Sequence, residues 1–396
     1  MFDLAAIQAA LVQAKIDGWL FYDFRSSNVL ARRILGIRDD AVTTRRFYYC
    51  VPARGEPRKL VHRIESGTLD HLPGAKHVYS RWQDLDGGLK SLLSGLKRVA
   101  MEYSPNNAIP YISRVDAGTV EAVRGLGVDV VSSGDLVQTF EAAWSDQQWQ
   151  MHLAAAEQTT AAYDHAWALI KQKVVAEGSI HELVVQGAIL DFFRAAGLVT
   201  DHPPIVAVGP HSGDPHYEPR PGDGGLIRRD SFVLIDLWGK LDHPDAVYSD
   251  LTRVGFVGES VPARYEEVFQ IVARARDAAI DRVKTAFART EPLCGWQVDD
   301  AAREVIAAAG YGAQFVHRTG HSIGRETHGN GANMDNLETH DERRVLPRTC
   351  FSIEPGIYLA DFGARSEINV FIDAASAVHV TGGPLQTSVL PILANA

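Results

Sequence analysis

Hydrophobic and polar residues alternate in short runs along the first third of the chain. Residues 1–18 carry apolar side chains at the spacing of an amphipathic helix. Short apolar runs follow at 18–24, 45–53 and 97–103, and each has the length of a buried strand. This order of helix-like and strand-like segments predicts a small α/β domain.

A change of pattern near Trp144 marks the approach to a second domain. A stretch rich in alanine, without glycine or proline, predicts a long helix over 149–174. A second helix is predicted over 179–197, where Ser179 and Glu182 stand three apart, the spacing of a capping box. Because 396 residues exceed what one core usually fills, we place a boundary just ahead of the first helix. The expected domains are 1–147 and 148–396.

The second domain is expected to use one order of elements twice, helices followed by a pair of strands. Its loop at 201–225 is dense in proline, glycine and histidine, so we expect the loop to be exposed and to carry binding groups. The fold class is therefore α/β, of the mixed α+β kind. The predicted strand pairs are 232–239 with 246–257, joined by a polar turn at 240–245, and 350–359 with 364–372; the predicted helices between them are 264–287 and 298–310.

Composition restricts the partners of the protein. With 46% hydrophobic and 22% charged residues the chain is typical of a soluble globular protein. A net charge of -10 argues against nucleic-acid binding, which needs a basic surface. No apolar run reaches the roughly 18 residues of a membrane span, and Asp3 stands where a signal peptide would be basic. The cysteines form no Cys-x-x-Cys pair, so we expect a cytoplasmic protein without a disulfide framework. The charge favours a small or neutral partner.

The segment HRTGHSIGRETHGNG, residues 317–331, holds three histidines in fifteen residues. His321 and His328 stand seven apart, each beside a glycine. Such a segment suits either a metal ligand with a catalytic partner or a polar loop that is rich in imidazole. The motif alone does not decide between them, and the choice depends on carboxylates elsewhere in the chain.

Four acidic residues interrupt the predicted strands. Buried carboxylates need positive partners, because an unpaired charge in an apolar interior is very unfavourable. Salt bridges are one explanation, since Arg253 lies near one acid and Arg365 near another. Four acids on two strand pairs, together with His321, favour a shared metal site instead. The four acids are Asp236, Asp250, Glu354 and Glu367.

The donor types also restrict the metal. Four carboxylates and one imidazole are mainly oxygen donors, which suit manganese, cobalt or iron better than a thiolate-rich structural zinc site. Four acids are more than one divalent ion needs. Two ions would balance the charge, and paired ions can hold a hydroxide nucleophile while they polarise a carbonyl.

At these residues the sequence resembles metallopeptidase family M24, whose pita-bread fold is shared by methionine aminopeptidases, aminopeptidase P and prolidase. The resemblance runs from about residue 148 to the end, and the N-terminal part resembles the creatinase/prolidase N-terminal domain. It implies a C-terminal domain with two pseudo-twofold halves of helices and a hairpin. It also implies two divalent ions, with Mn²⁺ expected and Co²⁺ or Zn²⁺ as alternatives, and a hydroxide nucleophile that bridges them.

The resemblance further implies a role for each matching residue. Asp236 would bind one metal, Asp250 and Glu367 would bridge both, and His321 and Glu354 would bind the other. Glu354 would also act as general base.

Three further residues match positions on the substrate side. His216 and His328 would bind the scissile carbonyl and stabilise the tetrahedral intermediate. Arg365 would brace the metal-binding carboxylates. The other loop histidines are expected to be surface or hydrogen-bonding residues rather than ligands; they are His202, His211, His243 and His317.

The chain departs from the family pattern in three places. Asp236 and Asp250 are fourteen apart, a longer spacing that we attribute to a lengthened turn, and Trp238 stands at a usual glycine position. Gly329 follows His328, where the family often has an acid. No arginine stands at the expected place for binding the carboxylate of a leaving proline. The candidates for that role are His340, Arg343 and Arg344.

The expected activity is hydrolysis of the bond between an N-terminal residue and proline, in Xaa-Pro dipeptides, by a homodimer. The N-terminal domain favours this branch over methionine aminopeptidases, and the length resembles that of bacterial prolidases. Aminopeptidase P activity on longer peptides remains an alternative. A metal-free creatinase-type hydrolase or a non-catalytic binding module would lack ligands that this chain retains.

Overall fold

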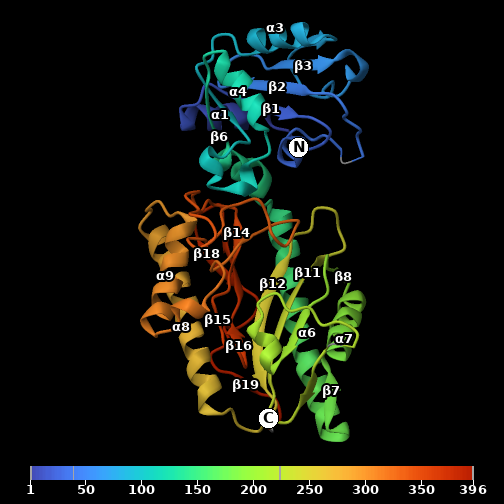
Figure 1. The fold of residues 1–396 in the computed structure, drawn as a ribbon, viewed down its shortest axis with the longest axis vertical. Coiled ribbons are helices and arrows are strands. Elements are labelled where there is room, and N and C mark those ends of the chain that lie inside the picture. The colour runs from blue at the N-terminus through green and yellow to red at the C-terminus, as the bar shows by residue number, and fades with distance from the viewer. Residues whose placement is uncertain (1, 39, 223, 395–396) are drawn as a thin grey trace. The chain divides into compact units, whose positions relative to one another are not determined.

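The computed structural model describes residues 2–38, 40–222 and 224–394, and the chain divides into two compact units, Met1–Glu141 and Ala142–Ala396 (Figure 1). The sequence places the boundary slightly later, at 147. The difference arises because Trp144 is buried in the second unit, where its ring stacks on Phe371 with centroids 5.3 Å apart. Among the described residues, no helix combines the length and the apolar character that crossing a membrane requires.

The first unit is built on a six-stranded mixed sheet in the order β4-β3-β2-β1-β5-β6. Side chains of its central strand β1 alternate between two hydrophobic clusters, Trp19 and Phe21 in one, Leu20 and Tyr22 in the other. Helices cover both faces, which is why this strand is buried throughout. The strands are β1 Gly18–Asp23, β2 Phe47–Pro52, β3 Arg58–His62, β4 Ala75–Tyr79, β5 Arg98–Met101 and β6 Asp129–Ser132; the helices are α1 Leu4–Ala14, α2 Val29–Ile34, α3 Trp82–Leu92, α4 Ala117–Gly125 and α5 Gly134–Val137.

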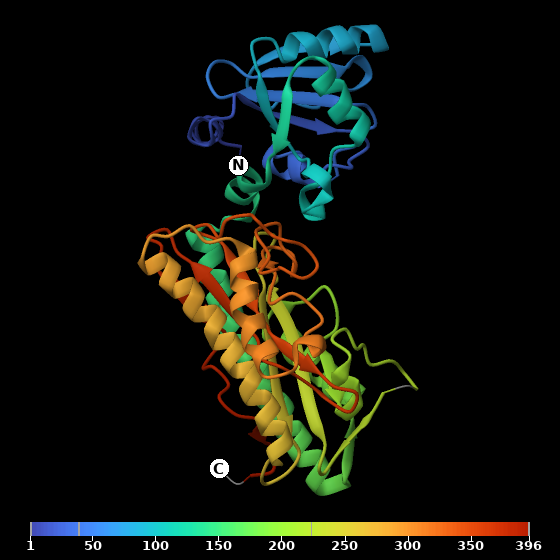
Figure 2. The same ribbon diagram turned by 60° about the vertical axis from the view of Figure 1, so that its left-hand side comes forward.

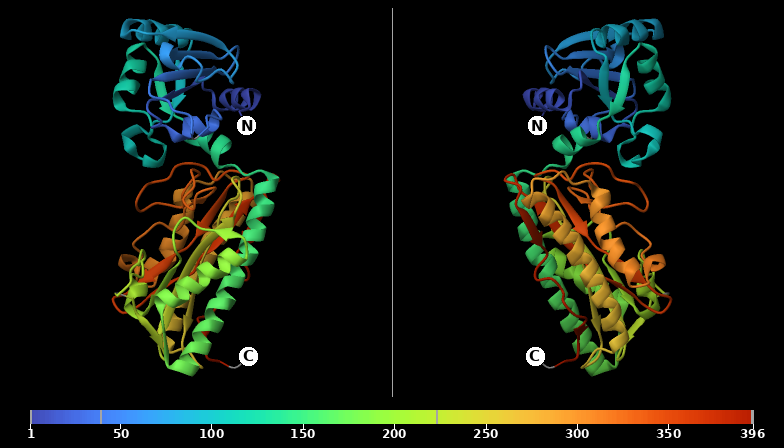
Figure 3. Two further views of the ribbon diagram at one scale, coloured as in Figure 1. Left: turned by 90° about the vertical axis from the view of Figure 1, so that its right-hand side faces the viewer. Right: turned by 90° about the vertical axis from the view of Figure 1, so that its left-hand side faces the viewer.

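In the second unit, one pair of helices lies on each side of the strands. Helices α6 and α7 lie on one side and α8 and α9 on the other, as the two views of Figure 3 and the turned view of Figure 2 show. Separate hydrophobic clusters fill the two helix layers. The helices are α6 Asp146–Glu177, α7 Glu182–Ala195, α8 Ala263–Ala288 and α9 Gly295–Ala308.

The strands of this unit form several small sheets. The largest has the order β19-β12-β11-β8 with β9 also paired to β11, and a second has the order β13-β14-β17-β18. The remaining pairs are β15 with β16 and β10 with β7. The strands are β7 Ser179–His181, β8 Leu198–Val199, β9 Ile205–Val208, β10 Leu226–Arg228, β11 Phe232–Leu241, β12 Ser249–Phe256, β13 Ser322–Ile323, β14 Cys350–Ile353, β15 Gly356–Tyr358, β16 Gly363–Arg365, β17 Ile368–Ile372, β18 Val378–Thr381 and β19 Leu390–Pro391.

The second predicted strand pair is interrupted in the middle. β14 pairs with β17, and β15 pairs with β16, so the two ladders separate around Pro355 and Ser366. Proline has no N–H to donate to a ladder, which favours such a break. Glu354 and Glu367 lie opposite each other where this break begins, one just after β14 and one just before β17. The interruption therefore frees both acidic side chains from regular strand geometry.

The predicted capping box is wrong. Ser179 belongs to β7, and α7 begins at Glu182 with His181 as its N-cap residue. The His181 ring accepts a hydrogen bond from the main-chain N of Leu183, so the Ser179 hydroxyl is not needed as a cap. Glu182 is buried and directs its carboxylate away from the helix, towards the segment after β9.

Candidate metal centre

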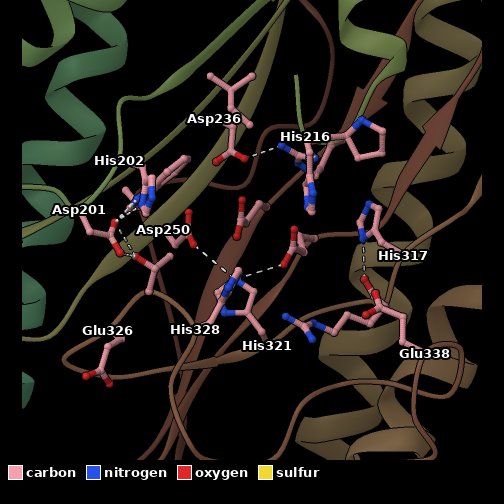
Figure 4. Close-up of a pocket in the computed structure, with 18 residues that line it drawn as sticks. Asp201, His202, His216, Asp236, Asp250, His317, His321, Glu326, His328 and Glu338 are labelled. Atoms are coloured by element: carbon pink, nitrogen blue, oxygen red, sulfur yellow. Dashed lines mark hydrogen bonds and ion pairs between the residues drawn. The ribbon is translucent and has the colours of Figure 1, made fainter. Parts of the chain in front are cut away.

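One cavity of about 380 Å³ in the second unit is lined by the five candidate metal ligands and by the three residues expected beside them (Figure 4). They come from segments far apart in the chain, which the two strand pairs and the histidine-rich segment bring together. These lining residues are His216, Asp236, Asp250, His321, His328, Glu354, Arg365 and Glu367.

The hairpin β11–β12 supplies the two aspartates. Asp236 pairs in register with Thr252, and Trp238 pairs with Asp250. Directly opposed residues share a face of a sheet, and so do residues two apart along a strand. All four side chains therefore face the same side. The wide spacing of the aspartates is accommodated in the turn, so both still reach the cavity.

His321 is oriented as a metal ligand. Its Nδ1 donates to the carbonyl of Ser322 at 3.1 Å, which leaves Nε2 facing Asp250 and Glu354, each 3.4 Å away. A ligating histidine commonly uses its second nitrogen in this way to fix its tautomer. The hydroxyl of Ser352 accepts from the main-chain N of His321 at 2.9 Å and donates to Glu354 at 3.0 Å. One serine thus places two candidate ligands.

The carboxylates of the cluster fit divalent cations. Ligand atoms of Asp250, His321 and Glu367 lie within 4.8 Å of one another. Among the described residues, Asp236 Oδ1 and Glu367 Oε1 are buried without a hydrogen-bond partner. Buried polar atoms are normally satisfied, so these oxygens require a positive partner. Oxygen donors with one imidazole suit a hard or borderline divalent metal.

The salt bridges considered as the alternative do not form as expected. Arg365 forms an ion pair with Asp236, while Glu367 accepts from Thr252 at 2.8 Å. Arg253 donates to the carbonyl of Gly382 at 2.8 Å and makes no ion pair with Asp250. Arg365 is therefore the arginine that pairs with this group of four acids, three of which are buried, and the group is short of positive charge.

The pKa values of the four acids reflect the shortage of positive charge around them. Burial raises the pKa of Asp236 to about 7, even though Arg365 opposes the shift. Burial and then the neighbouring acids raise the pKa of Glu367 well above its usual range, and burial also raises the pKa of Asp250. Glu354 differs, because His321 and other cations lower its pKa in spite of burial. Glu354 is thus the carboxyl of the cluster most ready to be ionised.

Arg365 is braced on three sides. Its Nε donates to Thr252 at 3.0 Å and its Nη1 donates to the Tyr358 hydroxyl at 2.9 Å, while its remaining nitrogen pairs with Asp236. The sequence analysis missed Thr252, Ser352 and Tyr358. Thr252 lies two positions from Asp250 and Ser352 two positions from Glu354, so strand alternation could have identified both.

Two of the cavity's histidines, His328 and His216, are the expected substrate-side residues. The His328 ring faces the cavity and meets the His321 ring edge-on, with centroids 4.3 Å apart. The charge of His321 and burial lower the pKa of His328 to about 3, so His328 is neutral. His216 is exposed and projects into the cavity from a different side (Figure 4).

His317 lines the cavity as a hydrogen-bonding residue. Its Nδ1 donates to the carbonyl of Arg318 at 2.7 Å, and its Nε2 accepts from the Tyr358 hydroxyl at 2.7 Å. Because both ring nitrogens are occupied, His317 shapes the wall and has no N–H left to offer a ligand. Burial lowers the pKa of His317 to about 4, which keeps the ring neutral.

The cavity wall differs from the set of residues that the sequence suggested for binding a substrate carboxylate. Of the three candidates for binding a substrate carboxylate, none lines the cavity, and Arg343 is buried against Asp341 at 2.6 Å. Arg318 lines it instead. Trp238 is also a wall residue, and it donates its indole N–H to Asp201 at 2.7 Å.

The raised pKa values predict that metal binding strengthens with pH. A metal ion displaces protons from its carboxylate ligands, so Mn²⁺ affinity should rise as pH increases through about 7, the pKa of Asp236. In the metal-free protein the sign is opposite. A carboxyl whose pKa is raised by folding stabilises the protein at low pH, and this contribution is lost as pH rises. Thermal unfolding of metal-free and Mn²⁺-loaded protein at pH 6 and 8 should show the larger metal-induced increase in Tm at pH 8. A larger increase at pH 6 would contradict the assignment.

Comparisons with known proteins agree with this geometry. The sequence model of Metallopeptidase family M24 matches residues 150–374. "Probable dipeptidase PepE" of Mycobacterium tuberculosis is 27% identical over 351 residues, which span 86% of this chain and 85% of that protein. An Xaa-Pro dipeptidase of Lactobacillus delbrueckii subsp. lactis is 34% identical over 164 residues, 41% of this chain and 40% of the relative.

A solved structure shares the fold. Dipeptidase PepE from Mycobacterium ulcerans superposes with a TM-score of 0.69 at 24% identity, and the match covers 98% of this chain and 96% of that one. The mixed α/β class and the pita-bread fold expected from the sequence are confirmed. Since the family match spans more than half of the 396 residues, the chain belongs to metallopeptidase family M24, in its prolidase branch, and is a hydrolase of the peptidase class.

Proposed function

We propose that this cavity hydrolyses the bond between an N-terminal residue and a following proline in Xaa-Pro dipeptides, with two divalent ions bound. One observation carries the proposal: five potential ligands from separate segments converge in a single cavity, together with two histidines and an arginine. Mn²⁺ as the metal, a homodimer and a cytoplasmic location belong to the proposal as expectations from the sequence.

The metal ligands in this proposal are the four acids and His321. Their donor types fit, and two buried carboxylate oxygens among them have no hydrogen-bond partner within the described ranges. Paired divalent ions supply an activated water and polarise the scissile carbonyl. Arg365 holds Asp236 in place, and Ser352 holds His321 and Glu354. The protein thereby fixes the ligand geometry before any ion binds.

Glu354 and His328 act on the substrate in this proposal. Glu354 is ionised, so its carboxylate accepts the proton of the attacking water and returns it to the leaving proline nitrogen. His328 is neutral and donates one ring N–H to the carbonyl oxygen as negative charge develops there. His216, on the other side of the cavity, would make a second contact to the substrate.

Two features favour dipeptides as substrates. The cavity is within the size range of small-molecule sites, about 300–1,000 Å³. Arg318 on its wall provides a cation for the free carboxylate of a dipeptide. The relatives reported above, one named Xaa-Pro dipeptidase and the other dipeptidase, support the same choice.

Cleavage of Ala-Pro compared with Ala-Pro-Ala tests the substrate. With Mn²⁺ supplied, we expect kcat/KM for Ala-Pro to exceed that for the tripeptide by about tenfold or more. The reason is that the free carboxylate of the dipeptide can pair with the Arg318 side chain. Comparable efficiency on the tripeptide would assign the protein to the aminopeptidase P type. Cleavage of neither peptide, in protein that binds two metal equivalents, would refute the proposed function.

A further inference from the structure

A completely buried carboxylate outside the metal cluster links the chain on both sides of His216. Glu182, at the first position of α7, is 0% exposed. Its Oε1 accepts from the main-chain N of Val208 at 2.6 Å, and its Oε2 accepts from the main-chain N of Gly225. Val208 ends β9, and Gly225 immediately precedes β10. One side chain therefore fastens both ends of the segment that carries His216.

Two side chains within that segment reach the same carboxylate. His211 Nδ1 donates to Glu182 at 3.0 Å, and the Tyr217 hydroxyl donates to Glu182 at 2.9 Å. The rings of His211 and Tyr217 stack with centroids 4.3 Å apart. His216 directly precedes Tyr217, so its backbone is held within one residue of this anchor.

Strand β16 holds the other side of the segment. Arg365 Nη1 donates to the carbonyl of Pro215 at 3.3 Å, and the main-chain N of Gly363 donates to the Ser212 hydroxyl at 2.9 Å. His216 thus lies between a residue tied to Arg365 and a residue tied to Glu182. Placement to within about 1 Å matters for a group that contacts a reacting substrate.

We propose that Glu182 is a positioning residue that sets His216 against the substrate. The inference rests on the proposed function, in which His216 contacts the substrate carbonyl. Glu182 touches neither the substrate nor the metal ligands, and it acts only through the segment between Val208 and Gly225.

Only a carboxylate satisfies this arrangement. Each oxygen accepts from one main-chain N–H, and a main-chain N–H cannot become an acceptor. In Glu182→Gln the new NH₂ group must face one of these two N–H groups, whichever way the amide is turned. The substitution therefore breaks one end of the segment while it changes the side-chain volume very little.

The test measures whether Glu182 and His216 act as one unit. In Mn²⁺-loaded protein, Glu182→Gln should lower kcat for Ala-Pro by about tenfold or more, with a smaller change in KM, because the contact is misplaced rather than removed. In the Glu182→Gln/His216→Ala double variant, kcat should be no lower than in His216→Ala alone. Hydrogen exchange at the Val208 and Gly225 amides should also quicken in Glu182→Gln.

Glu266→Gln is the matched control. Glu266 in α8 likewise accepts a main-chain N–H from a distant segment, from Val389 at 3.0 Å, and lies outside the cavity. Its replacement should leave kcat, and exchange at Val208 and Gly225, unchanged. If Glu182→Gln does not fold, Tyr217→Phe, which keeps both main-chain bonds, should give a smaller loss of kcat that also vanishes in a His216→Ala background.

Independent effects would overturn the proposal. If the losses from Glu182→Gln and His216→Ala multiply in the double variant, Glu182 stabilises the fold without positioning His216. Unchanged exchange at Val208 and Gly225 would equally contradict the anchor. If the wild-type protein cleaves no proline peptide, the proposed function fails, and the exchange measurement still decides whether Glu182 holds the segment.

Discussion

Glu367→Ala is expected to abolish metal-dependent peptide hydrolysis and to leave the protein folded. Glu367 places one buried oxygen without a protein partner beside Asp250 and His321, so its loss removes a ligand that the metal pair needs. The fold should persist, because the substitution removes a carboxylate that repels the neighbouring acids. Asp250→Ala should behave in the same way.

The measurement for Glu367→Ala combines activity, metal content and thermal unfolding. Metal analysis after dialysis should give fewer than two equivalents, while circular dichroism remains that of the wild type. Glu342→Ala provides the control, because Glu342 is an exposed acid outside the cavity. Activity retained by Glu367→Ala at saturating Mn²⁺ would refute the role of Glu367 as a bridging ligand.

His328→Ala should lower kcat by about a hundredfold or more, as loss of a donor to developing oxyanion charge typically does. His328 is suited to donate because it lines the cavity edge-on to His321 and is a neutral imidazole with one ring N–H at pH 7. KM should change much less than kcat, since the contact strengthens in the transition state. Bound metal should stay at the wild-type amount.

His317→Ala separates this role from general damage to the cavity wall. Both nitrogens of His317 are occupied by Tyr358 and by a main-chain carbonyl, so its loss should reduce kcat less than the loss of His328. An unchanged kcat in His328→Ala would show that His328 is structural. Equal effects of both substitutions would show that the wall, and not a specific donor, is required.

The strands and their acids could be predicted because each carries a local signal. Asp236 and Asp250 interrupt apolar runs, and a carboxylate inside a buried strand indicates a functional or paired site. Thr252 and Ser352 each lie two positions from one of the acids and so share a strand face with it. Because hydroxyl side chains are common in strands, their presence does not by itself indicate a functional site. The break of the second strand pair at Pro355 also had a local signal in the proline itself.

Other features could not be predicted because they depend on contacts distant in sequence. Arg365 lies two positions before Glu367 in the sequence but pairs with Asp236, which lies 129 residues away. Glu182 has the spacing of a cap, but its carboxylate binds Val208 at the end of β9 and Gly225, which the pairing of β7 with β10 brings close. Local spacing suggested a partner in each case, and tertiary packing supplied a different one.

A crystal structure grown with excess Mn²⁺, recorded with anomalous scattering, tests the central claim most directly. The account predicts two anomalous peaks about 3.5–4 Å apart, coordinated by the four acids and His321, with Glu354 and His328 facing the space above them. An absence of peaks among these residues, with Asp236 bound only to Arg365 and the other acids bound only to protein groups, would contradict it.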